Sequence, residues 1–232
     1  MKAILLDLDG TLSHMDTHKF LKTYIYALAQ NFTKWIEPKD FMQQVMRSTE
    51  VMVRNSNPNR TNKEVFLEDF SAAVQLEEKF LWEIFYRFYA EDFSQFRKMV
   101  TTNPVGRELV ITAKTKGWKV AVASNPVHPK VAMEERVRWG GLEPQQVDFV
   151  PSIEEMHYCK PNPLYFAEVA QAVGVNPTSC IMVGNDEKED LVASKIGMKT
   201  FCITADTKEV KADYKGKLEG FLNLIKTDKI NI

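Results

Sequence analysis

The sequence has almost no net charge and no long apolar run. Lys and Arg number 30 against 31 Asp and Glu. This balance gives no strong electrostatic field for nucleic acid or an anionic membrane, and we expect neither as a partner. No run of about 18 apolar residues occurs, and the apolar stretch in MKAILLDLDG is too short for a signal peptide. We therefore expect neither a membrane span nor export.

Cysteine is also scarce. The three cysteines form no CxxC pair, and Cys180 and Cys202 lie in apolar runs typical of buried strands, where a thiol packs as a small hydrophobic group. We expect a reducing, cytoplasmic location. Hydrophobic residues make up 44% of the 232 residues. That is enough to build a substantial core in one large domain or two small ones.

Several apolar runs predict buried strands. Residues 2–8 form a continuous apolar run that ends in acidic residues and glycine, which is typical of a parallel strand covered by helices on both faces. Residues 118–123, 179–183 and 198–204 have the same character, and 147–150 is a shorter candidate. Because helical patterns lie between these runs, we predict an α/β fold with a Rossmann-like, doubly wound parallel sheet.

The helical patterns have recognisable ends. Asn162 is predicted to cap a helix that starts at Pro163 and ends before Gly174. Thr61 and Glu64 form a capping-box pattern at the start of another helix.

A second region of the chain reads as all-helical. From about residue 12 to residue 92, apolar residues recur at spacings of three and four, in stripes that predict amphipathic helices. The aromatic side chains of these stripes are expected mainly as core, with a substrate cage as the alternative. We predict a core domain of residues 1–12 and 97–232, with a helical cap inserted at 13–96.

The segment Asp7-Leu8-Asp9-Gly10-Thr11 follows the first predicted strand, at the edge where open α/β sheets bind ligands. Residues i and i+2 of a strand share a face, so Asp7 and Asp9 can reach one pocket. Two close carboxylates favour a hard divalent cation, and Mg²⁺ is the expected one. Gly10 allows a sharp turn, and Thr11 is expected to hydrogen-bond locally. In a DxD motif that stands alone, it is equally common that one aspartate caps a helix and the other ends a strand in water.

Three later motifs follow predicted strands or start helices. Ser124-Asn125 comes after the second strand, Lys160-Pro161-Asn162-Pro163 starts a helix, and Gly184-Asn185-Asp186 begins an acidic segment that ends at Asp190. Each has a simpler interpretation: a Ser-Asn turn, a solvated surface lysine, and an acidic first turn that complements a helix dipole.

Together these motifs resemble, in family order, those of the haloacid dehalogenase superfamily. The resemblance implies a phosphatase in which Asp7 is the nucleophile, Asp9 is the general acid and base and meets the metal through its main-chain carbonyl, and Ser124, Asn125 and Lys160 bind phosphate. Asn185 or Asp186 would bind the metal, with Asp190 as an inner ligand or a support behind it; the family commonly has Asp where Asn185 stands. A helical insertion between the first two motifs resembles the C1-capped branch, and the presence of Asp9 argues against dehalogenation.

The expected substrate is a small phosphorylated metabolite. Two alternatives stay open: a sugar phosphomutase of the β-phosphoglucomutase type, and a non-catalytic protein that binds phosphate and metal. His14, Asp16 and His18 either meet substrate or lie in an exposed linker. His128 is expected at the start of a helix, with the rim of the pocket as the alternative. The charged residues 208–217 are expected to be a solvated face. The sequence does not indicate an oligomeric state.

Overall fold

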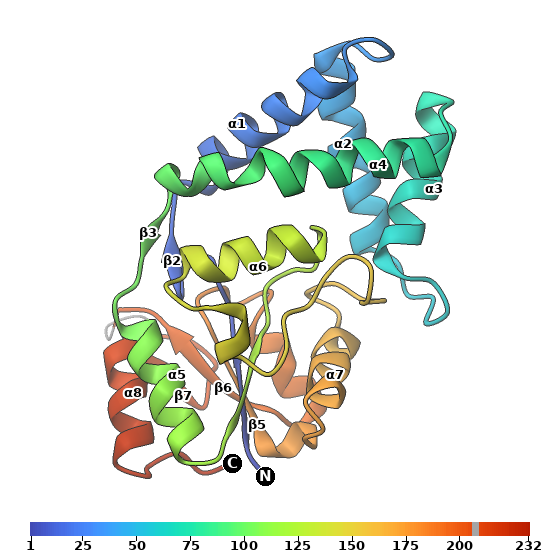
Figure 1. Cartoon of the computed structure of the whole chain (residues 1–232). Coiled ribbons are helices and arrows are strands. Elements are labelled where there is room, and N and C mark those ends of the chain that lie inside the picture. The colour runs from blue at the N-terminus through green and yellow to red at the C-terminus, as the bar shows by residue number, and fades with distance from the viewer. Residues whose placement is uncertain (206–208) are drawn as a thin grey trace.

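The computed structural model describes residues 1–205 and 209–232, and within them it contains a five-stranded sheet (Figure 1). The strand order is β4-β1-β5-β6-β7, and each neighbouring pair is parallel. The strands are β1 Ala3–Leu6, β4 Lys119–Val122, β5 Cys180–Gly184, β6 Lys199–Ile203 and β7 Tyr214–Gly216. Because β1 pairs with both β4 and β5, the segments that follow these three strands lie side by side.

Helices cover both faces of this sheet (Figure 1). They are α5 Val105–Thr115, α6 Lys130–Trp139, α7 Pro163–Ala172 and α8 Leu218–Lys226. Ile4 and Leu6 of β1 pack in one cluster with residues of α5, α6 and α8, whereas Ala3 and Leu5 pack in another with residues of α7. Successive strand residues point to opposite faces, so a strand covered on both sides is apolar throughout. The predicted doubly wound α/β fold is confirmed.

The predicted caps are present. The Asn162 side chain accepts a hydrogen bond from the Leu164 amide at 3.0 Å, with Pro163 as the first residue of α7. In the helical region, Thr61 accepts from the Glu64 amide at 3.3 Å, and Glu64 accepts from the Thr61 amide at 2.8 Å. This capping box fixes the start of a helix by satisfying two main-chain donors.

One expected strand is corrected, and one strand that was not expected is present. Residues 147–150 form only an isolated bridge, between Phe149 and Ala121. The Asp148 carboxylate accepts from the Val120 amide at 2.9 Å and so takes a donor that a longer ladder would use. In residues 209–217 the charged side chains are exposed, as expected of a solvated face. The same segment contains β7, in which Tyr214 is half-buried, Lys215 is exposed and Gly216 is buried. Lys208 lies outside the described residues.

The helices of the second region lie beyond one end of the sheet (Figure 1). They are α1 Thr17–Ala29, α2 Pro38–Val53, α3 Asn62–Val74 and α4 Glu78–Glu91. Short 3₁₀ segments complete the chain: η1 Gln30–Phe32, η2 Phe93–Met99, η3 Pro144–Gln146, η4 Pro177–Ser179 and η5 Leu191–Ile196. As the apolar stripes predict, the helices pack around aromatic residues, with Phe32, Phe41 and Phe70 fully buried.

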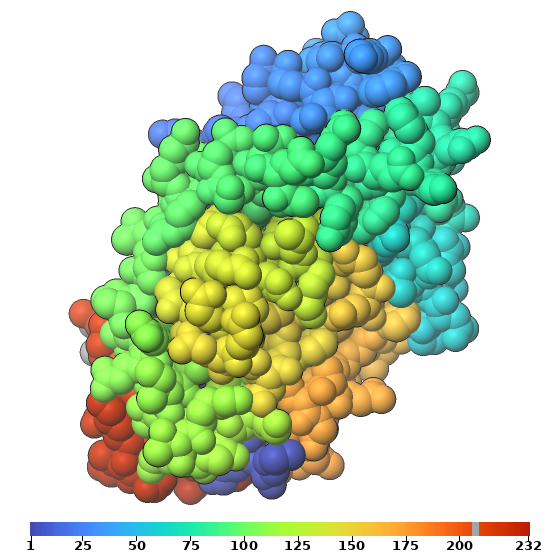
Figure 2. All heavy atoms as spheres, in the orientation of Figure 1, coloured from blue at the N-terminus to red at the C-terminus, as the bar shows by residue number. Residues whose placement is uncertain are grey.

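Two chain segments join the helical region to the sheet region side by side. Strands β2 (Ser13–His14) and β3 (Thr101–Thr102) pair antiparallel, as Figure 1 shows. Ala132 and Trp139 of α6 belong to the aromatic cluster of the helical region. On the face seen in Figure 2, the green atoms of the helical region lie directly against the yellow atoms that follow them in the chain. No helix in the described ranges has the length and apolar character needed to cross a membrane.

Candidate active site

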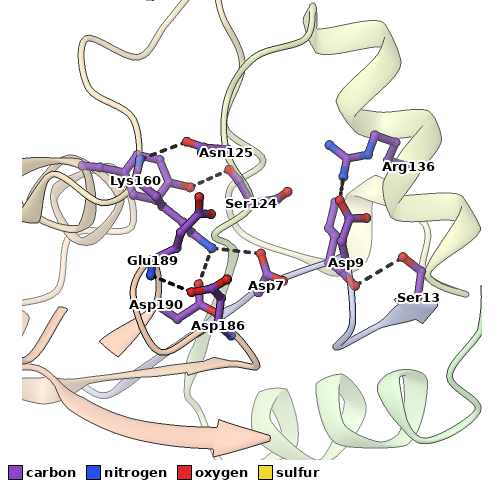
Figure 3. A network of polar contacts seen from close by, with 12 residues as sticks. Asp7, Asp9, Ser13, Ser124, Asn125, Arg136, Lys160, Asp186, Glu189 and Asp190 are labelled. Carbon is purple, nitrogen blue, oxygen red and sulfur yellow. Dashed lines mark hydrogen bonds and ion pairs between the residues drawn. The ribbon is translucent and has the colours of Figure 1, made fainter. Parts of the chain in front are cut away.

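The sequence motifs meet at the carboxyl ends of neighbouring strands. Asp7 directly follows β1, Ser124 lies two residues after β4, and Asn185 directly follows β5. Parallel pairing of β1 with both neighbours brings these ends together. Figure 3 shows the resulting network of acidic, basic and amide side chains. Ligands of open α/β sheets bind at this edge, so the folded chain supplies a polar site where the topology favours one.

Asp7, Lys160 and Asp190 form a buried chain of ion pairs. The Lys160 Nζ atom lies 2.9 Å from Asp7 Oδ1 and 2.6 Å from Asp190 Oδ1. The Lys160 side chain is 2% exposed and that of Asp190 is 1% exposed. A lysine this deeply buried must be paired, because an isolated ammonium loses its hydration without compensation. The interpretation of Lys160 as a solvated surface charge is therefore wrong.

The electrostatics of Asp7 are those of a buried carboxyl group in an acidic site. Its pKa is raised to about 7, mainly by burial and to a smaller extent by the charges of Asp190 and Asp9, against the lowering effect of Lys160. For Lys160, burial acts to lower the pKa, but the attraction of Asp7 and Asp190 outweighs it and the pKa is raised. Lys160 therefore stays charged beside Asp7 at neutral pH.

Asp9 points away from Asp7 and toward helix α6 (Figure 3). Its Oδ2 atom accepts a hydrogen bond from Nη2 of Arg136. The Arg136 side chain is 6% exposed, whereas that of Asp9 is 36% exposed. Asp9 Oδ1 has no hydrogen-bond partner among the described residues. The two aspartates of the first motif thus form ion pairs with two different buried side chains, Asp7 with Lys160 and Asp9 with Arg136.

Sequence reasoning missed Arg136. The signal was present: Arg136 lies on the apolar face of α6, three residues after Met133 and one before Val137, both fully buried. Burial acts to lower the pKa of Arg136, but the attraction of Asp9, with a smaller contribution from Asp7, raises it. A charged residue on the inward stripe of an amphipathic helix needs a buried partner. In this fold the partner is Asp9.

Ser124 and Asn125 connect the end of β4 with the Lys160 loop. Ser124 is buried, and its main-chain carbonyl accepts a hydrogen bond from the Tyr165 hydroxyl at 2.8 Å. Asn125 Oδ1 accepts from the Lys160 amide at 2.9 Å. Asn125 therefore fixes the main chain that carries Lys160, a contact that sequence reasoning did not identify, and the Lys160–Pro161 peptide bond that follows is cis.

The turn after Asp9 depends on Gly10. Gly10 has a φ of +83°, and a Cβ atom built on it would lie 2.5 Å from the Asn185 side chain. The Gly10 amide donates to the Ser13 carbonyl at 2.6 Å. Thr11 supports the turn through its main chain, whose carbonyl accepts from Asn103 at 2.9 Å. The local hydrogen bond expected of the Thr11 hydroxyl is not found among the described residues, where this buried oxygen has no partner.

The acidic motif divides between two roles. Asp190 Oδ2 accepts from the Asp186 amide at 3.0 Å, while its other oxygen holds Lys160. Asp186 Oδ1 accepts hydrogen bonds from the amides of Lys188 and Glu189 at 2.8 and 3.0 Å. Asp186 therefore stabilises an acidic turn, which was the alternative to metal binding. Gly184 makes room for Asp190, because a Cβ atom at Gly184 would overlap that carboxylate.

The site has oxygen donors for a hard cation but no ready-made acidic cluster. Among the described residues, no group of three or more His, Cys, Asp or Glu side chains is placed to hold a metal. Asp190 is engaged with Lys160, and the Asp9 side chain with Arg136. Asp7, whose pKa is raised by burial and then by the neighbouring carboxylates of Asp190 and Asp9, remains as a donor together with the neutral amide of Asn185 over Gly10. Oxygen donors of this kind fit Mg²⁺, which uses few protein ligands and keeps water.

Four other candidates lie apart from the carboxylates. His14 and His18 are exposed, and Asp16 caps α1 by accepting from the Lys19 amide at 3.0 Å. His128 is buried before α6, where its Nε2 atom lies 3.3 Å from the Tyr24 hydroxyl and its Nδ1 atom 3.5 Å from Arg136 Nη1. Burial, followed by the charge of Arg136, lowers the pKa of His128 well below its usual value, so the ring is neutral.

The aromatic stripes form core, as expected, around one small cavity. Its volume is about 170 Å³. It is lined mainly by apolar side chains of α1 to α4, with Val127, Pro129 and Ile153 on the sheet side. Its lining includes no carboxylate, so the rings do not form a cage around Asp7 or Asp9.

The fold and the site define an α/β protein whose acidic motifs gather at the carboxyl edge of a parallel sheet. The model of the hydrolase family described as haloacid dehalogenase-like hydrolase matches residues 1–197. The chain belongs to this family.

Individual known proteins resemble the chain in part of its sequence or in its fold. A glyceraldehyde 3-phosphate phosphatase from Methanothermobacter thermautotrophicus is 30% identical over 109 residues, which are 47% of each chain. The chain therefore matches about half the length of this relative. A haloacid dehalogenase (HAD) phosphatase from Thermococcus onnurineus superposes with a TM-score of 0.60 at 20% identity, over 97% of this chain and 98% of that one. A β-phosphoglucomutase from Clostridium difficile gives 0.59 at 17% identity, over 100% of both chains. These structures share the fold.

Proposed function

We propose that this protein is a Mg²⁺-dependent phosphatase that hydrolyses a small phosphorylated metabolite through an aspartyl phosphate on Asp7. The observation that carries the proposal is the buried Asp7 at the end of β1, paired with Lys160 at 2.9 Å. A carboxylate fixed beside a charged lysine suits attack on a phosphoryl group, because both the nucleophile and the phosphate oxygens gain from a nearby cation. The match to a phosphatase over 109 residues supports this choice of reaction.

The reaction has two steps. In the first, an Asp7 oxygen bonds to phosphorus, the bond between phosphorus and the ester oxygen breaks, and Asp9 gives its proton to the departing alkoxide. In the second, Asp9 takes a proton from water as the water oxygen bonds to phosphorus and the bond from phosphorus to Asp7 breaks. Inorganic phosphate leaves, and both aspartates return to their first state. The first step requires that Asp9 leave the ion pair with Arg136, since a carboxylate in that pair carries no proton to donate.

The remaining motif residues supply charge and position. Lys160 offsets the negative charge of Asp7 and of the phosphoryl oxygens, while Ser124 and Asn125 bind those oxygens by hydrogen bonds. Asp190 keeps Lys160 in place through the contact at 2.6 Å. Phosphoryl transfer depends largely on such positioning and electrostatic stabilisation.

Mg²⁺ would be held by Asp7, the main-chain carbonyl of Asp9 and the Asn185 amide oxygen, with Asp186 as a further candidate. When bound, the cation neutralises negative charge that develops on the phosphoryl oxygens. The excess of carboxylates over cations at the site supports this assignment.

We also propose that residues 13–96 form a cap of the C1 type, and that residues 1–12 and 97–232 form the core domain. The paired linkers β2 and β3 support this division, because the chain leaves and re-enters the sheet region at one place. A cytoplasmic location belongs to the same proposal, supported by three buried cysteines that form no disulfide among the described residues.

The test is release of inorganic phosphate from a panel of phosphomonoesters, with and without Mg²⁺. The variant Asp7→Asn removes the nucleophile, and Asp16→Asn is the matched control, because Asp16 is exposed and asparagine caps a helix as well as aspartate does. We expect Mg²⁺-dependent turnover in the parent and in Asp16→Asn, and none in Asp7→Asn. Intact mass after rapid acid quench should show one phosphoryl group on the parent and on Asp16→Asn, and none on Asp7→Asn.

Each other outcome has a clear meaning. Full turnover by Asp7→Asn would show that another group attacks phosphorus. A folded parent that is inactive on every ester would refute the phosphatase assignment. Interconversion of sugar phosphates without phosphate release would then identify a mutase, and binding of phosphate and Mg²⁺ without any reaction would identify a binding protein.

A further inference from the structure

Tyr165 is a buried tyrosine of α7 whose hydroxyl reaches the segment that follows β4. Its side chain is 0% exposed and packs in the same cluster as Ala121 and Ala123. The hydroxyl donates a hydrogen bond to the Ser124 carbonyl at 2.8 Å. Burial, followed by the charge of Asp7, raises the pKa of Tyr165 well above its usual value. The hydroxyl therefore keeps its proton and remains a donor to the main chain.

The peptide unit that carries this carbonyl also carries the Asn125 amide. The Ser124–Asn125 bond is trans, and in a planar trans peptide the C=O and N–H bonds point in opposite directions. The Tyr165 hydroxyl therefore directs the Asn125 N–H bond away from α7. No acceptor for this amide is found among the described residues. The Ala123 amide bonds the Leu6 carbonyl at 2.7 Å, so this available main-chain donor lies near the end of β1, where the nucleophile is proposed.

A second hydrogen bond joins the same two segments. Asn125 Oδ1 accepts from the Lys160 amide at 2.9 Å, so Ser124 and Asn125 are each tied to residues 160–165. Tyr165 lies in the first turn of α7, and a hydrogen-bonded helical turn is stiffer than a loop. Two bonds from this segment thus fix both the position and the orientation of the Ser124–Asn125 peptide relative to Lys160.

We propose that Tyr165 is a positioning residue for the phosphoryl group, because it holds the Ser124–Asn125 peptide so that the Asn125 amide donates to a phosphoryl oxygen. The inference rests on the proposed function, which puts the phosphoryl group beside Asp7. Tyr165 acts through the main chain and not by contact with substrate. Main-chain donors that are oriented before the substrate arrives stabilise charge on oxygen without a cost of reorganisation.

Selective isotope labelling observes this amide directly. The sequence contains two Ser-Asn pairs, Ser56-Asn57 and Ser124-Asn125. Protein with ¹³C at the serine carbonyl carbon and ¹⁵N in asparagine therefore gives two signals in an experiment that correlates each amide with the preceding carbonyl. Asn57 is exposed between α2 and α3 and serves as the internal control, and Asn57→Gln assigns both signals by removing one. The ligand is methylphosphonate at fixed Mg²⁺, which has no ester bond to hydrolyse.

The variant is Tyr165→Phe, which removes the hydroxyl and keeps the ring. Tyr158→Phe is the matched control, because Tyr158 packs in the same cluster but its hydroxyl makes no hydrogen bond within the described part of the chain. In the parent and in Tyr158→Phe, methylphosphonate should move the Asn125 amide proton downfield and leave Asn57 unchanged. In Tyr165→Phe the movement should be smaller, and the dissociation constant should rise about fivefold or more.

The outcomes separate this inference from the proposed function. If Tyr165→Phe binds as tightly as the parent with the same movement of the Asn125 amide, or if Tyr158→Phe has an equal effect, the role of the Tyr165 hydroxyl is overturned while the phosphoryl site stands. Binding by the parent without movement of the Asn125 amide also overturns it. If methylphosphonate does not bind the parent at all, the phosphoryl site itself is wrong and the inference falls with it.

The carbonyl carbon of Ser124 decides the matter should Tyr165→Phe fail to fold. The same labelled parent reports its chemical shift, which responds to the hydrogen bond from Tyr165. We expect the shift typical of a hydrogen-bonded carbonyl to persist when methylphosphonate binds. Its loss in the complex would show that the peptide turns independently of Tyr165, and the inference would be overturned.

Discussion

Replacing Lys160 by methionine should destabilise the protein far more than a typical loss of a lysine. Lys160→Met keeps much of the side-chain volume but leaves Asp7 and Asp190 without the ammonium that lies 2.9 and 2.6 Å from them. Their side chains are 10% and 1% exposed, so water replaces little of the lost interaction. Removing one partner of a buried ion pair costs about 3–5 kcal/mol. We expect a loss in this range at about pH 8.

The loss of stability in Lys160→Met should increase with pH. Burial already raises the pKa of Asp7 to about 7, and Lys160 is the main influence that lowers it. Without Lys160 the pKa rises further, and a protonated Asp7 no longer needs a cation. The destabilisation should therefore be largest above about pH 8 and smaller near pH 5, where Asp7 is neutral in both proteins. An exposed ion pair would show no such trend through this range.

The assay is urea unfolding in metal-free buffer, followed by circular dichroism and tryptophan fluorescence. The matched control is Lys199→Met, because Lys199 also lies 2.6 Å from a carboxylate, that of Asp213, but is 45% exposed. Exposed pairs contribute up to about 1 kcal/mol. If Lys160→Met loses no more stability than Lys199→Met, the reasoning that the buried pairs depend on Lys160 is refuted.

Three further predictions follow from the same structure. Gly10→Ala places a Cβ atom 2.5 Å from the Asn185 side chain at a φ of +83°. We therefore expect the free energy of unfolding, measured with urea, to fall by about 1–2 kcal/mol and Mg²⁺ binding to weaken. If both values were unchanged, the tight turn at Gly10 would be contradicted. Phe70→Ala empties a fully buried site in the aromatic cluster and should cost about 3–5 kcal/mol in the same assay, whereas Tyr86→Ala, at a site that is 45% exposed, should cost less than about 1 kcal/mol. Mg²⁺ binding near pH 6 should release a proton from Asp7, whose raised pKa is about 7. Calorimetry in buffers of different ionisation enthalpy should show that this release becomes small by about pH 8. No proton release at either pH would exclude Asp7 as a titrating ligand.

Much of the fold could be read from the sequence because two periodicities separate cleanly. Strands covered on both faces are apolar at every position, as in β1. Helices that pack on one side are apolar at every third or fourth position. The failures occur where neither rule applies. β7 lies at the sheet edge with Lys215 exposed, so the sequence indicated its charged, solvated face but not the strand. Residues 147–150 are apolar enough for a strand, but Asp148 uses its carboxylate to bond a main-chain donor of β4.

The site was predictable only in part, for a different reason. The motif residues at the ends of β1, β4 and β5 follow from sequence order and parallel pairing. The role of Arg136 depends on which face of α6 turns toward a loop 127 positions away. The contact of Asn125 with the Lys160 amide joins two loops that are 35 positions apart. A pattern within one segment does not contain that information. Only the buried position of a charged residue between Met133 and Val137 indicates that a partner exists.

The charges at the site explain why the proposed reaction needs both a metal and a mobile Asp9. Asp7, Asp9 and Asp190 outnumber Lys160 and Arg136 before any substrate binds. A phosphoryl group adds negative charge beside Asp7, so without a divalent cation the site would repel the group it is proposed to bind. Arg136 lies at the Asp9 side, and its pairing with Asp9 leaves it unable to offset the phosphoryl charge. Phosphonate binding should therefore depend on Mg²⁺ in the parent, and this dependence should weaken in Asp9→Asn, where Arg136 becomes available.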